Sequence, residues 1–496
     1  MVPLLPAALG IWVRDAYLCA ARDEGSLVVD TITDGVSRAV GGVTGSVTGL
    51  FTDPVIRLGV TGLSRAGKTV FITSLVANLL DRGRMPQLLA AASGSITHAY
   101  LQPQPDDTIP RFDYEAHLGA MLGTEPRWPD STRAVSELRL SLKVQPQGFM
   151  GSLSGPRTVH LDIIDYPGEW LLDLGLLDKS YADWSRDVLT RMAARDFAAD
   201  YLTQIKDLDA STTYDEPRAQ ALAQSFTEYL HKARAAGLSD CTPGRFLLPG
   251  ELEGSPVLTF APIAAPAGAR RTLIREMERR FEAYKSKVVK PFFRDHFSRL
   301  DRQVVLVDVL GAIHEGPGAV EALRQTMADI LGAFRPGRNA FLSQLLLGRR
   351  VDRILFAATK ADHLHHAQHG RLTAIMEALT RDARDRARFA GAETGAMAIA
   401  SLRTTTETQL DHEGATLDAV AGLTEAGKRA AFYPGELPTD PSRILSPARE
   451  GAKDWPFGDV EVTRFRPPVQ EIAPGDGPPH IRLDKAAEFL MGDRLR

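Results

Sequence analysis

The 496-residue chain is long enough for two or three average domains, or for one domain with large insertions. Its composition, 44% hydrophobic and 24% charged, is typical of a soluble globular protein, and no apolar run reaches the roughly 18 residues of a transmembrane helix. The net charge of −4 argues against a general nucleic-acid binder. Cys19 and Cys241 form no C-x-x-C pair, so the sequence predicts neither a disulfide framework nor a cysteine zinc site and fits a reducing cytoplasm.

The first part of the chain predicts a helical region followed by a linker. Residues 2–13 are apolar, but they lack a basic segment and include two prolines, which argues against a signal peptide. Residues 14–40 have a helical pattern, and residues 41–49 are rich in glycine. We therefore assign residues 1–53 to an N-terminal helical segment with a glycine-rich linker.

Further along the chain, short apolar runs alternate with helical patterns. Strands are predicted at residues 56–61, 136–144, 158–164, 304–310, 354–358 and 396–400. The run at 136–144 alternates apolar and polar residues, as a half-exposed edge strand does. A helix is predicted at 70–80, and residues 85–132 look irregular apart from a helix at 114–122. The pattern predicts an α/β fold with a mostly parallel sheet covered by helices on both faces.

The same pattern divides the rest of the chain into four parts. They are a first core part at 54–170, a helical insertion at 171–302, a second core part at 303–403 and a turn-rich C-terminal extension at 404–496.

Residues 62–69 spell the phosphate-binding loop G-x-x-x-x-G-K-[ST] between a predicted strand and a predicted helix. Its glycines let backbone N–H groups surround a phosphate, and the helix offers the positive end of its dipole. Lys68 can reach the β- and γ-phosphates, and the Thr69 hydroxyl can bind Mg²⁺. The nucleotide-binding residues expected here are Gly62, Leu63, Ser64, Arg65, Ala66, Gly67, Lys68, Thr69 and Val70. The sequence therefore predicts a nucleoside triphosphate site.

Residues 422–429 nearly repeat this loop. Arg429 replaces the hydroxyl that Mg²⁺ needs, and Glu425 would face phosphate with like charge. We interpret the repeat as an ordinary loop.

Asp165-Tyr166-Pro167-Gly168 has the D-x-x-G form at the end of the strand predicted at 158–164. Asp165 can hold Mg²⁺ through water, and the Gly168 N–H can bind the γ-phosphate. Because hydrolysis removes that phosphate, the segment predicts a conformational switch. The alternative is a plain turn, which the same four residues also favour.

Thr359-Lys360-Ala361-Asp362 has the [NT]-K-x-D form after another predicted strand. Asp362 can accept both N–H donors of guanine, while the Lys360 stem lies over the ring. Adenine presents an acceptor there, so the motif selects guanine; the alternative is a helix start capped by Asp362. We also assign His363, which follows directly, and Ser401, just past the last strand, to nucleotide binding.

Residues 128–133 predict the mobile segment that gives a hydroxyl to Mg²⁺ and the γ-phosphate. Thr132 is the first candidate and Ser131 the second; Arg133 can supply charge and Trp128 an aromatic face, or both only pack or pair at the surface. The predicted catalytic residues are Lys68, Thr132, Arg133, Asp165 and Gly168. The predicted Mg²⁺ ligands are Thr69, Thr132 and Asp165.

With these motifs, the chain resembles the YcjX-like family of bacterial P-loop GTP-binding proteins. The resemblance extends from about residue 54 onward and rests on residues 61–69, 127–129, 135–140, 165–170, 359–362 and 489–493. It implies a cytoplasmic, GTPase-like protein with a Ras-like core, an added helical domain, and GTP or GDP bound with Mg²⁺. It also implies a link to the stress response and an inner-membrane protein partner, with a peripheral position at that membrane. Glu169 stands where small GTPases have glutamine, and because a carboxylate repels phosphate, fast hydrolysis is not expected.

Two other features allow more than one interpretation. On a helix, His365 and His369 would share a face and bind a metal, but no acidic partner is evident in the sequence, which favours a solvated or nucleotide-edge role. Residues 270–303 carry eleven basic and five acidic side chains, a net charge of +6, with an apolar helical face of Leu273, Met277, Phe281, Tyr284 and Val288. Such a segment either packs that face on a core or docks on an anionic membrane or partner.

Three functions are therefore open from the sequence. The first is a regulatory GTPase switch, and the second is a small-molecule kinase with its acceptor pocket in residues 171–302. The third is a scaffold stabilised by a nucleotide that it barely hydrolyses, for which Glu169 is the main indication. A kinase has no use for a guanine-reading motif at 359–362, which argues against the second.

Overall fold

The computed structural model describes residues 53–63, 65–130, 134–145, 155–206, 208–209, 212–264, 272–295, 299–332, 351–389 and 391–496. Residues 54–496 form one compact unit. The helix expected at 14–40 and the linker expected at 41–49 lie outside the described residues.

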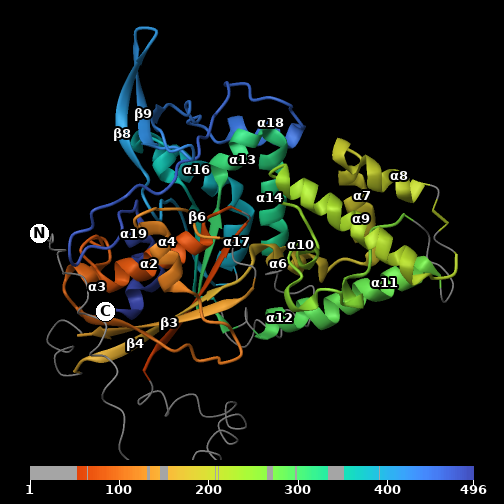
Figure 1. Cartoon of the computed structure of the whole chain (residues 1–496), viewed down its shortest axis with the longest axis horizontal. Coiled ribbons are helices and arrows are strands. Elements are labelled where there is room, and N and C mark those ends of the chain that lie inside the picture. Colours follow the sequence, from red (N-terminus) through yellow and green to blue (C-terminus); the bar gives the residue numbers. More distant parts are fainter. Residues whose placement is uncertain are drawn as a thin grey trace, which may run out of the picture. The chain divides into compact units, whose positions relative to one another are not determined.

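A seven-stranded mixed sheet in the order β2-β3-β4-β1-β5-β6-β7 forms the centre of the described chain (Figure 1). The parallel strands are β4 (Arg157–Asp165), β1 (Val55–Gly62), β5 (Arg302–Val307), β6 (Arg353–Ala358) and β7 (Glu393–Ala398). The remaining two, β2 (Ile96–Gln102) and β3 (Ser136–Val144), pair antiparallel. The α/β fold with a mostly parallel sheet is confirmed.

Alternate strand residues supply two hydrophobic layers. Val304 and Leu306 of β5 belong to one layer, with the buried faces of α2 (Lys68–Leu80) and α19 (Leu483–Met491). Val305 and Val307 belong to the other. That second layer also contains α13 (Val309–Glu315), α14 (Pro317–Gly332), α16 (His369–Leu379) and α17 (Arg381–Phe389). Helices therefore cover both faces of the sheet.

The insertion between β4 and β5 is helical and has an aromatic core. Its helices are α6 (Gly168–Leu172), α7 (Tyr181–Met192), α8 (Ala199–Lys206), α9 (Glu216–Ala235), α10 (Gly244–Leu247), α11 (Leu273–Tyr284) and α12 (Lys290–Asp295), with a π-helical turn at Lys285–Val289. Trp184 stacks on Phe281 with ring centroids 5.0 Å apart and meets Phe260 edge-on at 5.5 Å. These buried rings form the aromatic core of the insertion, which lies beside the sheet (Figure 1).

The basic segment packs its apolar face inward. Met277, Phe281 and Tyr284 are fully buried, and Leu273 and Val288 are buried as well. Several of its cations pair with acids, as Arg279 does with Glu276 at 2.7 Å. The helix is therefore a packing element of the insertion.

Several elements differ from the sequence expectations. Residues 96–102, expected to be irregular, form β2, so β3 is paired on both sides and is not an edge strand. The strand predicted at 304–310 ends at Val307, because the Asp308 carboxylate accepts from the Gly311 N–H at 2.9 Å and begins α13. A short helix, α3 (Leu89–Ala92), and α4 (Tyr114–Leu122) complete the first half.

The C-terminal part contains more regular structure than the turn-rich extension that the sequence predicts. β8 (Thr405–His412), β9 (Ala415–Leu423) and β10 (Arg429–Phe432) form a three-stranded antiparallel sheet. α18 (Ser442–Glu450) follows, and α19 returns to the central sheet. Along the described part of the chain, no helix is long and apolar enough to cross a membrane.

Candidate functional site

The carboxyl ends of the parallel strands bring the sequence motifs to one edge of the sheet. Gly62 ends β1, Asp165 ends β4, Asp308 follows β5, and Thr359 follows β6. β1 lies between β4 and β5, so the chain leaves the sheet on both sides of the phosphate-binding loop. This edge is where ligands bind in open α/β sheets.

The phosphate-binding loop has the backbone that its sequence predicts. Gly67, with φ of 79°, lies in the left-handed region at the start of α2, where glycine is favoured. Lys68 and Thr69 form the first turn of α2, so the positive end of the helix dipole points to the same place. Arg65 also has a positive φ, 64°, and Ser64 lies outside the described residues.

A cavity of about 340 Å³ opens beside this loop. Its lining comes from six separate segments of sequence: Leu63, Arg65, Ala66, Gly67, Lys68, Thr69 and Val70; Trp128, Pro129 and Asp130; Thr359, Lys360, Asp362 and His363; Ala400, Ser401, Leu402 and Thr404; Glu425; and Arg464 and Phe465. Its size is that of a site for a drug-sized or nucleotide-sized ligand. The phosphate loop and the guanine motif, almost 300 residues apart, thus share one cavity.

Hydrogen bonds and an ion pair hold the predicted base-reading motif in place. The buried Asp362 carboxylate accepts hydrogen bonds from the Thr404 N–H at 2.9 Å and from the Thr404 hydroxyl at 2.6 Å, both through Oδ2. The Thr359 N–H donates to the Val307 carbonyl at 2.9 Å. Lys360, with φ of 60°, forms an ion pair with Asp308. Asp362 is therefore held at the cavity wall by Thr404, which the sequence motifs do not indicate.

His363 forms part of the same wall. It is buried, its ring lies edge-on to Phe465 with centroids 5.4 Å apart, and its Nδ1 has no hydrogen-bond partner within the described structure. Burial lowers the pKa of His363, against an opposing effect of Asp362, so the neutral imidazole is favoured. A neutral ring offers both a donor and an acceptor to a ligand.

The D-x-x-G segment abuts the phosphate loop from β4. Asp165 is buried, with 1% of its surface exposed. Gly168 lies so close to the loop that a Cβ on it would be 1.9 Å from the Gly62 carbonyl oxygen. Neither Asp165 nor Gly168 lines the cavity, so the structure places them next to the phosphate loop but not in the cavity wall.

Glu169 is paired with a side chain of the helical insertion. Its carboxylate forms an ion pair with Arg234 of α9 at 3.0 Å, and 8% of its side chain is exposed. The Arg245 guanidinium lies over the Trp170 ring, 3.2 Å from the ring centroid, in a cation–π contact. Helix α6, directly after the D-x-x-G segment, is therefore held by insertion side chains.

Asp173 continues this attachment. It accepts hydrogen bonds from the Tyr284 hydroxyl and from the Gly244 N–H, the latter at 2.7 Å. Burial raises the pKa of Asp173 to about 7, although both hydrogen bonds oppose that change. Residues of α10 and α11 thus meet the carboxyl-terminal side of α6.

The C-terminal sheet contributes a wall that the sequence did not predict. Residues 422–429 are a β-hairpin rather than an ordinary loop, since Gly422 and Leu423 end β9 and Arg429 begins β10. The turn brings Glu425 to the cavity, beside Arg464 and Phe465. The Trp128 indole N–H donates to the Phe465 carbonyl at 2.8 Å, which joins the predicted mobile segment to this wall.

The remaining candidates have different outcomes. Ser131, Thr132 and Arg133 lie outside the described residues. His369 cannot share a metal with His365 in this arrangement, because its Nε2 contacts the Ala361 carbonyl at 2.8 Å and its Nδ1 lies 3.1 Å from Arg482. An acidic partner of the histidines does exist, since Glu407 of β8 reaches His365 and His366.

Known proteins match this chain over most of its length. A family model described as "YcjX-like family, DUF463" matches residues 56–495. A protein named "Ras-like GTPase YcjX" from Escherichia coli is 37% identical over 464 residues, covering 90% of this chain and 97% of that protein. Its namesake from Shewanella oneidensis is 33% identical, covering 89% of this chain and 95% of that protein.

A solved structure of the "Signal recognition particle receptor SRb-GTP/SRX complex from Chaetomium thermophilum" covers 73% of this chain and 94% of its own, with 14% identity and a TM-score of 0.23, too low a similarity to inform the fold. The family match and the two relatives cover the same residues that form the sheet, the insertion and the cavity. The chain belongs to the YcjX-like family.

Proposed function

We propose that this protein binds GTP and GDP with Mg²⁺, hydrolyses GTP slowly and acts as a nucleotide-dependent switch. The observation that carries the proposal is the single cavity shared by the phosphate loop around Lys68 and the base-reading motif around Asp362. The relatives' printed name, "Ras-like GTPase", supports the same function.

Guanine selection in this proposal rests on the fixed carboxylate of Asp362. Thr404 occupies one side of the group, through Oδ2, and so sets the direction in which the carboxylate meets a ligand. A carboxylate accepts from the two N–H donors of guanine and meets no such pair on adenine. His363 and Ser401 close the base end of the cavity.

The residues near the phosphate loop suit Mg²⁺. Thr69 provides a hydroxyl at the first turn of α2, and Asp165 provides a buried carboxylate at the end of the neighbouring strand. Hydroxyl and carboxylate oxygens are the ligands that Mg²⁺ prefers, and the bound ion would neutralise charge on the β- and γ-phosphates. Thr132 is the further ligand proposed from sequence.

Slow hydrolysis follows from the position of Glu169. The corresponding glutamine of small GTPases orients the attacking water, whereas Glu169 is engaged with Arg234 of the insertion. The ion pair between Glu169 and Arg234 also favours an alternative function, a scaffold that is stabilised by nucleotide and barely hydrolyses it.

The switch in this proposal is α6 with the D-x-x-G segment before it. Loss of the γ-phosphate would release Gly168, and α6 would transmit the change to α9, α10 and α11 through Glu169, Trp170 and Asp173. Cytoplasmic location and a role in the stress response enter the proposal through the family resemblance alone. Docking of residues 270–303 on an inner-membrane partner gains no support from their packed face and acid-paired cations.

A nucleotide titration of the purified chain tests the proposal. We expect GTP and GDP to bind more tightly than ATP, and Asp362→Asn to shift the preference from GTP to XTP, because an amide offers one donor where guanine needs an acceptor. Asp130→Asn, at another cavity-lining carboxylate, is the matched control and should keep the GTP preference. A GTP preference that survives in Asp362→Asn would refute guanine reading by this residue.

The same titration examines the phosphate loop. Lys68→Ala should weaken GTP binding by about 30-fold or more, since removal of one partner of a buried charge pair costs about 2–5 kcal/mol. Lys428→Ala, at the matching position of the near-repeat, should leave binding unchanged, because Lys428 does not line the cavity. An equal loss of GTP affinity in Lys68→Ala and Lys428→Ala would contradict the assignment of the loop. A separate assay for free phosphate released from GTP distinguishes a slow GTPase from a scaffold.

A further inference from the structure

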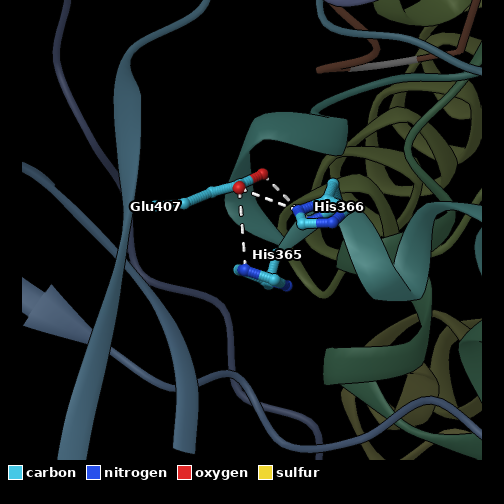
Figure 2. A group of neighbouring side chains, drawn as sticks. All are labelled: His365, His366 and Glu407. Carbon is cyan, nitrogen blue, oxygen red and sulfur yellow. Dashed lines mark hydrogen bonds and ion pairs between the residues drawn. The ribbon is translucent and has the colours of Figure 1, made fainter.

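Three side chains from two distant segments meet outside the nucleotide cavity (Figure 2). Glu407 Oε2 lies 2.8 Å from His366 Nδ1 and 3.6 Å from His365 Nε2. One possible ligand atom from each of the three residues lies within 4.8 Å of the others. The Glu407 carboxylate therefore contacts both imidazoles, whose ring centroids lie 4.3 Å apart, and all three groups can ligate a metal.

The two backbones that carry these groups are held in place. His365 precedes the 3₁₀ turn His366–Gln368, and Glu407 lies in β8. The His366 N–H also donates to Glu407 Oε1 at 3.1 Å.

We propose that His365, His366 and Glu407 form a binding site for Zn²⁺ or a similar borderline divalent cation. Two imidazoles and one carboxylate are a known zinc ligand set, with a water in the fourth position. Ligand atoms at tetrahedral Zn²⁺ lie about 3.4 Å apart, given arms of about 2.0–2.2 Å. The two separations from Glu407 Oε2, 2.8 and 3.6 Å, need to change by well under 1 Å to reach this value.

Asp418 supplies the outer partner that metal-bound histidines usually have. Its Oδ2 lies 3.7 Å from Nδ1 of His365, on the ring nitrogen opposite the one that faces Glu407. The same Nδ1 accepts a hydrogen bond from the Ala367 N–H at 3.4 Å, and metal binding at Nε2 would make Nδ1 a donor toward Asp418. His366 is 67% exposed on its side chain, so a metal and its water can enter from solvent.

A bound cation would join two elements that border the nucleotide cavity. The turn with His365 and His366 follows Asp362 directly, while β8 follows Thr404, which holds Asp362. β8 also pairs with β9, whose turn carries Glu425 to the cavity. The metal site requires no nucleotide, so it can be tested independently of the proposed GTP function.

Zinc titration of the untagged full chain tests the site. Protein first dialysed against a chelator is titrated with Zn²⁺ in competition with a chromogenic zinc indicator. We expect one equivalent that out-competes the indicator, weakened more than about tenfold in Glu407→Gln and in His366→Ala, and weakened less in Asp418→Asn. His412→Ala removes an exposed histidine from the same strand and should bind as the wild type does.

Hydrogen exchange gives a second readout that needs no activity. Zn²⁺ should slow exchange in residues 363–368 and in β8 of the wild type and of His412→Ala, but not of Glu407→Gln. Circular dichroism confirms that each variant is folded. Absence of competitive Zn²⁺ binding in the wild type, or equal binding in Glu407→Gln, would overturn the site and leave these residues as an ion-paired surface contact.

Discussion

Gly168 packs tightly against the phosphate loop. A methyl group at this position would lie 1.9 Å from the Gly62 carbonyl oxygen, a distance that no relaxation of side chains can relieve. The residue is therefore required to be glycine by packing, in addition to any bond from its N–H to a phosphate. The two roles are compatible, because both need the backbone of Gly168 at the loop.

Gly168→Ala should destabilise the fold or displace α6 from the loop. Overpacking of this kind costs about 1–3 kcal/mol, and more where backbone is the obstacle. Urea unfolding and GTP titration of the variant measure the two effects. Gly119→Ala in α4 is the control, and it should increase stability. No other part of the protein lies within 4 Å of a Cβ there, and alanine favours a helix. Equal stability of wild type and Gly168→Ala would contradict the contact.

Individual site residues differ in how far the sequence could predict them. Lys68 and Asp362 belong to motifs with fixed spacing, and both line the cavity. Thr404, Arg464 and Phe465 also line it, but they lie outside the motifs and reach the cavity through tertiary packing. No local pattern marks such residues, because their position depends on tertiary contacts made far along the chain.

At the scale of elements, the sequence predicted some helices and strands and missed others. The helix predicted at 114–122 and the strand predicted at 136–144 have the bounds observed for α4 and β3. β2 and β8 were missed because each has only one buried residue, so neither has an apolar face that would give an alternating signal. The hairpin at 422–429 was missed because β10 is four residues long and has no buried residue.

Helix α6 is the element that connects the candidate site to the insertion. Its Glu169 is nearly buried, so the ion pair with Arg234 satisfies a charge that water reaches poorly. The same helix contacts Arg245 through Trp170. Movement of the D-x-x-G segment would therefore change contacts on α9 and α10.

Arg234→Ala should loosen this connection. Without its cation, Glu169 is left nearly buried and unpaired, which favours local opening of α6. We expect faster hydrogen exchange at residues 168–176, with GTP affinity within about threefold of the wild type. Arg218→Ala, an exposed position on the same helix, should leave this exchange unchanged. Wild-type exchange of α6 in Arg234→Ala would exclude this pair as a coupling contact.

At the scale of the whole molecule, Arg302 joins three parts of the sequence. It is buried at the start of β5, where its guanidinium donates to the Leu490 carbonyl at 2.8 Å, to Asp352 at 2.6 Å and to Asp493 at 2.8 Å. These bonds attach α19 to the centre of the sheet. The closing segment at 489–493, part of the family resemblance, thus has a structural role.

Arg302→Met should lower the free energy of unfolding by about 2–4 kcal/mol. Removal of one partner of a buried pair costs about 3–5 kcal/mol, less here because both carboxylates keep some access to water. Chemical denaturation monitors the change. Arg275→Met removes an exposed arginine that pairs with Glu278 and should cost less than about 0.5 kcal/mol. A similar loss of unfolding free energy in Arg302→Met and Arg275→Met would show that the buried Arg302 contacts add no more stability than an exposed ion pair.

The position of α19 also determines when the molecule can fold during its synthesis. Asn78 of α2 donates to the Pro478 carbonyl across 400 positions of sequence, and Leu490 and Met491 close the same hydrophobic layer as α2. Domains fold as units, and here the first strand and the phosphate-loop helix complete their packing only with residues about 400 positions further along the chain. Until then, one apolar face of the nascent sheet is open to other chains. We expect this protein to need shielding of that face while it folds, because exposed apolar surface on a partly folded chain promotes aggregation.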